Sequence, residues 1–196
     1  MNSNSEITIV SGLPRSGTSL MMQMLAQGGV EVVTDEIRAS DIDNPRGYYE
    51  FEQVKKIKED ASWLPDTRGK GFKMVSQLLY DLPPSETYRI VFMRREYDEM
   101  LASQEKMLAR RGKPAAPRDE IRRAFTQHLD RLFAWLEEQP NMKVLFVHYQ
   151  DLVANPLEQA MRINAFLGGR LDVDKMAAAV DPSLYRNRQP GDASKA

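Results

Sequence analysis

The sequence has no cysteine and few histidines, and both shortages narrow the chemistry open to the protein. Its 196 residues include no cysteine and two histidines. Disulfides, thiolate zinc sites, iron–sulfur clusters and cysteine nucleophiles are therefore excluded. A metal site rich in histidine is excluded for the same reason.

Long apolar runs and an excess of one charge are also missing. No segment approaches the roughly 18 consecutive apolar residues of a membrane helix, and residues 1–6 lack the basic and apolar regions of a signal peptide. We therefore expect a cytoplasmic protein without a membrane partner. The formal net charge of −1 gives no overall attraction to nucleic acid, so an anionic ligand needs a local cluster of cations.

Length and composition are those of an ordinary globular protein, with 42% hydrophobic and 28% charged residues. A chain of 196 residues without an internal repeat predicts a single domain over residues 1–196. We expect residues 1–5 and 191–196 to be frayed ends.

Short apolar runs rich in β-branched and aromatic residues predict the strands of a parallel sheet. Because these runs are continuous and do not alternate with polar residues, each strand should be buried on both faces. Stretches with helical spacing lie between them, at 18–27, 98–111 and 119–139. The pattern predicts a doubly wound α/β fold, like that of P-loop NTPases, with about five strands flanked by helices. The predicted strands are 7–10, 30–33, 72–75, 90–93 and 144–147.

Two long connections interrupt this plan, at residues 34–49 and 110–118. Connections of this length in compact domains are often functional. The second contains Pro114 and Pro117 among basic residues. It is either a solvated basic turn or a lid over an acceptor site, and the sequence leaves both open.

A glycine-rich turn follows the first predicted strand and opens the first predicted helix. Gly12 and Gly17 bracket four residues, as in a Walker A loop, so backbone N–H groups can surround a phosphate at the helix N-terminus. Thr18 stands where a P-loop kinase has its lysine, and a cation comes three residues earlier as Arg15. The alternative is a strand-to-helix turn that binds no ligand.

This turn resembles the 5'-phosphosulfate loop of the sulfotransferases that use 3'-phosphoadenosine-5'-phosphosulfate (PAPS). The match extends over Pro14, Arg15, Ser16, Gly17, Thr18 and Ser19. The resemblance implies transfer of a sulfuryl group from PAPS to a hydroxyl or amine, with 3',5'-ADP as product and no metal. It also implies that the loop backbone and the hydroxyls of residues 16, 18 and 19 hold the phosphosulfate, while Arg15 neutralises the leaving group.

A second match to the same family lies at the end of the fourth predicted strand. Arg95 and Ser103, eight residues apart, have the spacing of the family's arginine and serine that hold the 3'-phosphate. Ser103 shares a helical stripe with Met100 and Met107 that should face inward, and a buried hydroxyl needs a partner. The partner is a phosphate or the serine's own helix backbone. Strand alternation sends Arg94 to the opposite side from Arg95, and the spacing to Ser103 favours Arg95.

Weaker matches extend along the chain. Lys73 resembles the family's second catalytic cation, which contacts the transferred sulfonate, and residues 149–152 and 155–156 resemble the motifs that follow its last strand. Arg186 and Arg188 correspond to a basic segment that contacts phosphate, although the family's glycine-rich form is absent. A solvated basic tail is the alternative.

The acceptor's general base is the main departure from the family pattern. Cytosolic members have a histidine two residues after the lysine that Lys73 resembles, and this chain has Val75 there. We predict Glu50 as the base, since it ends the 34–49 connection, although it could instead belong to the first turn of a helix over 51–60. His148, at the end of the last strand, is a site imidazole or a packed one. His128 lies beside an apolar helical stripe and is predicted to pack there.

Two other functions fit parts of this sequence. A P-loop kinase or NTPase would need a loop lysine and a Mg²⁺-binding acid after a core strand, where Arg94 and Arg95 stand instead. A non-catalytic protein that binds PAPS or another nucleotide would need no base. The acceptor of an active enzyme could be a small molecule, a carbohydrate or a peptide.

Overall fold

The core of the structure, a computed structural model, is a sheet of four parallel strands in the order β2-β1-β3-β4. Residues 5–35, 41, 47–181 and 183 are described. The prediction of one domain over 1–196 stays a prediction, because residues near both ends lie outside this part. The strands are β1 (Glu6–Gly12), β2 (Gly71–Lys73), β3 (Thr87–Arg94) and β4 (Met142–His148).

The predicted strand at 30–33 is an edge segment and not a full strand of the sheet. Val32 forms one parallel bridge with Gly71, and the Gly71 N–H donates to the Glu31 carbonyl at 2.8 Å. The Val33 N–H donates in turn to the Gly71 carbonyl, also at 2.8 Å. Because β2 has only three residues, it offers few backbone groups to an outer neighbour. The expectation of about five strands is therefore corrected to four strands and a bridge.

The helices expected from the sequence are present with small shifts at their ends. They are α1 (Thr18–Gln27), α2 (Tyr97–Arg110) and α3 (Arg118–Glu137). Further helical elements lie beyond those expected. They are the helices α4 (Tyr149–Ala154), α5 (Pro156–Phe166) and α6 (Val173–Ala178) and the 3₁₀ helices η1 (Glu52–Lys56), η2 (Leu64–Thr67) and η3 (Ser76–Asp81). Among the described residues, no helix has the length and apolar character needed to cross a membrane.

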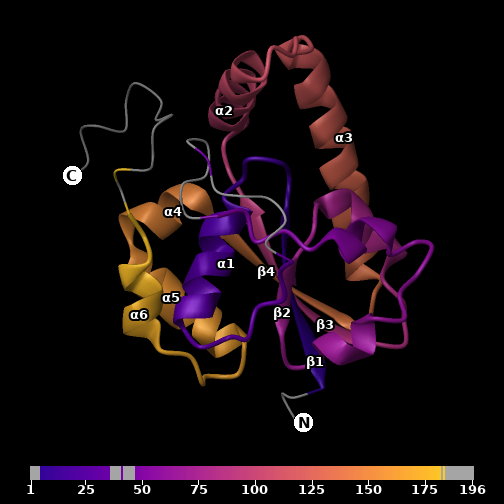
Figure 1. Cartoon of the computed structure of the whole chain (residues 1–196), viewed down its shortest axis with the longest axis vertical. Helices are drawn as coiled ribbons and strands as arrows, with labels where there is room; N and C mark the ends of the chain where they lie inside the picture. Colours follow the sequence, from indigo (N-terminus) through magenta and orange to yellow (C-terminus); the bar gives the residue numbers. More distant parts are fainter. Residues whose placement is uncertain (1–4, 36–40, 42–46, 182, 184–196) are drawn as a thin grey trace.

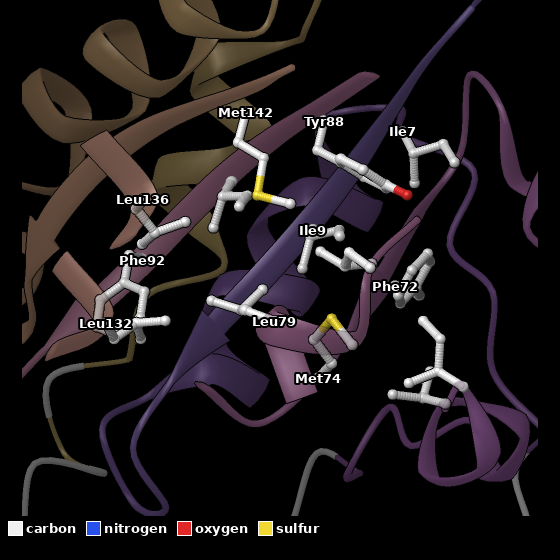
Figure 2. Close-up of a cluster of buried hydrophobic side chains, with 14 of the residues drawn as sticks. Ile7, Ile9, Phe72, Met74, Leu79, Tyr88, Phe92, Leu132, Leu136 and Met142 are labelled. Atoms are coloured by element: carbon white, nitrogen blue, oxygen red, sulfur yellow. The ribbon is translucent and has the colours of Figure 1, made fainter. Parts of the chain in front are cut away.

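Alternate residues of the central strands point into two separate apolar clusters, one on each face of the sheet. From β3, Ile90 and Phe92 enter one cluster, while Val91 and Met93 enter the other. Helix α3 and the 3₁₀ helices cover the first face, where Figure 2 shows Leu132 and Leu136 beside Phe92. Helices α1, α4, α5 and α6 cover the second (Figure 1). The prediction of strands buried on both faces is confirmed for β1 and β3, whereas most residues of β4 and of the segment 30–33 are partly buried or exposed.

The strand order fixes where a ligand can bind. From β1 the chain passes to β2 on one side and then to β3 on the other, so the direction of the connections reverses between β1 and β3. Open α/β sheets bind ligands at the carboxyl ends of the strands beside such a reversal. Helices α1 and α2 begin just beyond the ends of β1 and β3, at this edge.

Candidate functional site

The turn from β1 into α1 depends on two residues with left-handed backbone conformations. Arg15 has φ of 69° and Gly17, the N-cap of α1, has φ of 102°. The Ser16 N–H donates to the Leu13 carbonyl at 3.2 Å and closes the turn. The first N–H groups of an α-helix have no acceptor within the helix, so this turn presents donors and a positive helix end to an anion.

Both loop glycines are required by close packing. A Cβ atom on Gly12 would lie 2.5 Å from Ser16 Oγ and 2.7 Å from the Met93 carbonyl oxygen. A Cβ atom on Gly17 would lie 2.5 Å from Cδ2 of Tyr149. The loop therefore rests directly on the end of β3 and on the first residue of α4, with no space for a side chain.

Ser16 has a buried hydroxyl that lacks a hydrogen-bond partner in the described part of the chain. Leaving such a group unpaired costs about 1 to 3 kcal/mol. A bound phosphate or sulfonate would supply an acceptor at this turn. The orphaned hydroxyl and the packed glycines both fit a loop that binds a phosphate-bearing donor.

The two residues that the sequence singled out both contact the loop: Ser103 in α2, and Arg95, which lies between β3 and α2. Arg15 Nε donates to Ser103 Oγ at 3.0 Å, and Arg95 NH1 lies 3.5 Å from the Arg15 carbonyl oxygen, which accepts from it. Ser103 is buried, as its helical stripe predicts, and it accepts from the loop arginine. The structure thus brings Arg15, Arg95 and Ser103 together.

Arg94 and Arg95 point to different surroundings. The guanidinium of Arg94 lies 5.7 Å from the ring centre of Phe133 in α3, and the residue is exposed. The guanidinium of Arg95 lies 4.2 Å from the ring centre of Tyr149, beside the loop. Arg95 is therefore the member of the pair that can act with the loop.

Lys73 reaches the start of α1 from the end of β2. Its Nζ donates to the Tyr48 carbonyl and to Ser19 Oγ, the latter at 3.4 Å. Ser19 Oγ donates to the same carbonyl at 3.3 Å. Lys73 therefore lies at the junction of β2, α1 and the segment that contains Tyr48.

The two long connections meet at Asp41. The Tyr48 hydroxyl donates to Asp41 Oδ1 at 2.7 Å, and Arg111 NH2 lies 3.9 Å from Asp41 Oδ2. The basic connection after α2 is thus linked to the segment that supplies the carbonyl partner of Lys73. This contact brings a basic turn to the edge of the candidate site.

The candidate bases lie outside these contacts. Glu50 precedes η1 by two residues, so its placement in the first turn of a helix over 51–60 is wrong. The Glu50 carbonyl accepts from Thr34 Oγ1 at 3.0 Å, which fixes the backbone there. A hydrogen bond with Glu52 is the main cause that raises the pKa of Lys55, and the charge of Glu50 adds a smaller contribution.

His148 is exposed at the end of β4 and pairs in register with Arg94. Since Arg94 points to the α3 side, this placement does not bring His148 to the loop. The exposure also means that His148 is not a buried, packed imidazole. Arg186 and Arg188 lie outside the described residues.

His128 packs against η3. Its Nε2 lies 2.9 Å from the hydroxyl of Ser76, which is fully buried, and its ring lies 6.3 Å from that of Tyr80. Burial lowers the pKa of His128. Val75, beside Ser76, is 44% exposed and cannot exchange a proton. No cluster of three or more metal-binding side chains occurs within the residues described.

Two residues that contact Gly17 or Arg95 were not identified as contacts from the sequence. Tyr149 was noted only within a motif, and its ring packs on both Gly17 and Arg95. Glu99 forms an ion pair with Arg95 at 2.9 Å. The spacing of four residues between Arg95, just before α2, and Glu99 in its first turn is a signal that could have indicated this pair.

A family model described as "Sulfotransferase family" matches residues 47–172, more than half of the chain. The chain belongs to the sulfotransferase family. The loop at residues 12–19 precedes the matched segment, so its similarity to the family's phosphosulfate loop is independent of this match. Comparison with curated protein sequences gives no significant match.

Solved sulfotransferase structures share the fold of this sulfotransferase. Mouse SULT7A1, complexed with PAP, superposes with a TM-score of 0.60 at 16% identity, over 92% of this chain and 66% of the mouse chain. The sulfotransferase domain from the curacin biosynthetic pathway superposes with a TM-score of 0.56 at 13% identity, over 94% and 92% of the two chains. A sulfotransferase from Alicyclobacillus acidocaldarius gives 0.50 at 16% identity, over 91% and 87%. This sulfotransferase thus spans just under two thirds of the mouse protein's length.

We predict that Gly17→Ala destabilises the protein far more than Gly29→Ala. The two glycines have nearly equal φ values of 102° and 101°, so both substitutions strain the backbone alike. A Cβ atom on Gly29 meets nothing within 4 Å, whereas one on Gly17 meets Tyr149. The difference in the free energy of unfolding, measured with urea, should be at least about 1 kcal/mol, as for other overpacked sites. Equal losses would contradict the packing of Tyr149 on the loop.

We also predict that His128 makes part of the stability pH-dependent. Its pKa is lowered from 6.5 in the folded protein, so the unfolded chain binds more protons as the pH falls below about 6.5. The free energy of unfolding should therefore decrease from about pH 7 to about pH 5. His128→Gln should flatten this dependence relative to the wild-type protein. Identical profiles for the variant and the wild-type protein would refute this assignment.

Proposed function

We propose that this sulfotransferase transfers a sulfuryl group from PAPS to a hydroxyl or amine acceptor by in-line displacement. The observation that carries the proposal is the contact of the loop with Ser103 and Arg95. This contact unites, at the carboxyl edge of the sheet, the two segments that match the family's phosphate-binding motifs. The mouse relative in complex with PAP, which is 3',5'-ADP, supports the same class of donor.

The loop would hold the 5'-phosphosulfate. Backbone N–H groups at the start of α1 would donate to its oxygens, and the hydroxyls of Ser16, Thr18 and Ser19 would add further donors. Gly12 and Gly17 allow the close packing of the turn on β3 and α4, and Pro14 would shape the turn through its fixed φ. The unpartnered hydroxyl of Ser16 supports this role.

Two cations would serve the transfer itself. Arg15 would neutralise the charge that builds up on the leaving phosphate, and Lys73 would contact the sulfonate. Ser19 accepts from Lys73, which places the ammonium at the first turn of α1, beside the proposed phosphosulfate site. Preorganised charges of this kind supply most of the catalysis in such displacements, and the step needs no divalent metal.

The 3'-phosphate would bind to Arg95 and Ser103. Both side chains are buried beside the loop, which supports a site that distinguishes PAPS from nucleotides without a 3'-phosphate. Arg186 and Arg188 are further proposed contacts of the donor. A basic segment that closes over a phosphate would add affinity through charge-assisted hydrogen bonds.

We propose Glu50 as the acceptor's base, with His148 as the alternative. Glu50 follows Tyr48 by two residues, and the Tyr48 carbonyl accepts from Lys73, so the chain that carries Glu50 passes next to the cation proposed to contact the sulfonate. His148 has less support because it pairs in register with Arg94, on the other side of β3 from the loop. The acceptor could be a small molecule, a carbohydrate or a peptide. A cytoplasmic location also stays a prediction.

A P-loop kinase fits this site less well. Strand β3 ends at Arg94 and Arg95 follows it, so cations occupy the place where a kinase needs an acid for Mg²⁺. One observation supports the alternative of a nucleotide-binding protein without catalytic activity. Val75 is exposed where cytosolic family members have their catalytic histidine.

We expect 3',5'-ADP to raise the melting temperature without metal, and to do so more than 5'-AMP or ATP with Mg²⁺. A ligand at about 100 times its dissociation constant stabilises the folded state by roughly 2.7 kcal/mol, enough for a thermal shift. Arg95→Ala should abolish the preference for the 3'-phosphate, while Arg94→Ala should keep it. Equal shifts with 5'-AMP and 3',5'-ADP would refute the proposed donor site.

We expect Glu50→Gln to slow sulfuryl transfer from PAPS to an unactivated alcohol by about 10² to 10⁴, because the base is removed while the shape is kept. Acidic phenols, which lose a proton more readily, should be less affected. Binding of 3',5'-ADP should persist, which calorimetry can check. His148→Gln is the matched control. If it abolishes transfer and Glu50→Gln retains full activity, the base is His148.

A further inference from the structure

Glu99 is one of two acidic residues that are buried in the described part of the chain, the other being Glu86. Its side chain is 1% exposed, and its Oε2 lies 2.9 Å from Nε of Arg95, whose side chain is 8% exposed. Removing two charges from water is costly, and a buried ion pair often stabilises a fold no better than apolar residues would. Stability alone therefore gives no reason for a carboxylate at this position.

The surroundings of Arg95 give a different reason for a carboxylate at residue 99. Glu99 in α2 binds the Nε edge of the guanidinium, and Tyr149 in α4 lies against its face at 4.2 Å. The carbonyl of Arg15, in the loop, accepts from NH1 at 3.5 Å. Three elements thus hold one planar group, and together they fix its tilt and its rotation.

We propose that Glu99 is a positioning residue that orients the guanidinium of Arg95 toward the 3'-phosphate of the donor. The inference rests on the proposed function. An arginine side chain has many rotamers, and a guanidinium binds phosphate well only when its N–H groups are aligned with the oxygens. The carboxylate holds Nε and so presets this alignment before the nucleotide binds. Its negative charge also lowers the local positive potential, so recognition depends on the geometry of Arg95.

The chain provides a matched control in Glu86. This buried carboxylate accepts from Arg68 at 2.8 Å through Nε and at 2.6 Å through NH2. Glu86 precedes β3, whereas Arg95 follows it, so the two pairs lie at opposite ends of the same strand. Glu86→Gln therefore weakens a similar ion pair far from the loop.

The test is the ratio of the dissociation constants of 5'-AMP and 3',5'-ADP, measured by calorimetry on the full chain. We expect Glu99→Gln to lower this ratio by about tenfold, the effect of one charge-assisted hydrogen bond, and Glu86→Gln to leave it unchanged. Glu99→Asp keeps the charge but shortens the side chain, so it should also lower the ratio. In an Arg95→Gln background, Glu99→Gln should have no further effect, since the group that it positions is gone.

The outcomes separate this inference from the proposed function. If the wild-type protein does not prefer 3',5'-ADP over 5'-AMP, the proposed function fails. If the wild-type protein prefers 3',5'-ADP and a folded Glu99→Gln variant keeps the full ratio of dissociation constants, the positioning role of Glu99 is wrong. An equal loss of preference in Glu86→Gln would overturn the inference as well, because the effect would then come from stability. Should Glu99→Gln fail to fold, Glu99→Asp and the Arg95→Gln, Glu99→Gln double variant decide the question.

Discussion

The close packing of one turn on its neighbours is the constraint on which the candidate site depends. The chain leaves β1 and enters α1 over a few residues that lie directly against the end of β3 and the ring of Tyr149. Gly12 and Gly17 are the residues that permit this approach. Because the turn cannot move away without losing these contacts, the N-terminus of α1 keeps a fixed position relative to the end of β3 and the start of α4.

Charge at this edge is local and specifically paired, in a chain whose net charge is close to zero. Arg15, in the loop, contacts Ser103 in α2, Lys73 contacts Ser19 at the start of α1, and Arg95, just after β3, contacts the loop backbone. A buried carboxylate, Glu99, forms an ion pair with Arg95. Such an arrangement binds an anion through aligned donors and not through a broad positive surface.

The two apolar clusters explain why a site can be built at this edge at all. The central strands are buried on both faces, so their side chains pack in the two clusters and hold the carboxyl ends of the strands in place. Loops and helix starts at those ends can then carry polar and charged groups at little cost to the core. Helix α3 contributes to one cluster through Leu132, and α1 contributes to the other through Leu25. The site lies between the helices of the two faces.

Local patterns in the sequence determined a large part of this structure. Continuous apolar runs predicted strands buried on both faces, helical spacing predicted α1, α2 and α3, and the loop from Pro14 to Ser19 indicated the family. Each of these features depends on residues that are near one another in the chain. Burial, helical periodicity and turn conformation act over a few residues, so they can be read without the fold.

Tertiary structure alone decided the contacts between distant segments. The predicted strand at 30–33 forms only one bridge, because the short strand β2 offers few backbone groups for it to pair with. The tertiary structure brought Arg95, which its spacing to Ser103 already favoured over Arg94, to the ring of Tyr149, and it brought Lys73 to the carbonyl of Tyr48 and His128 to Ser76. These partners lie far apart in sequence, or are backbone groups that any residue carries. They become neighbours only through the packing of helices on the two faces of the sheet, which no short sequence pattern specifies.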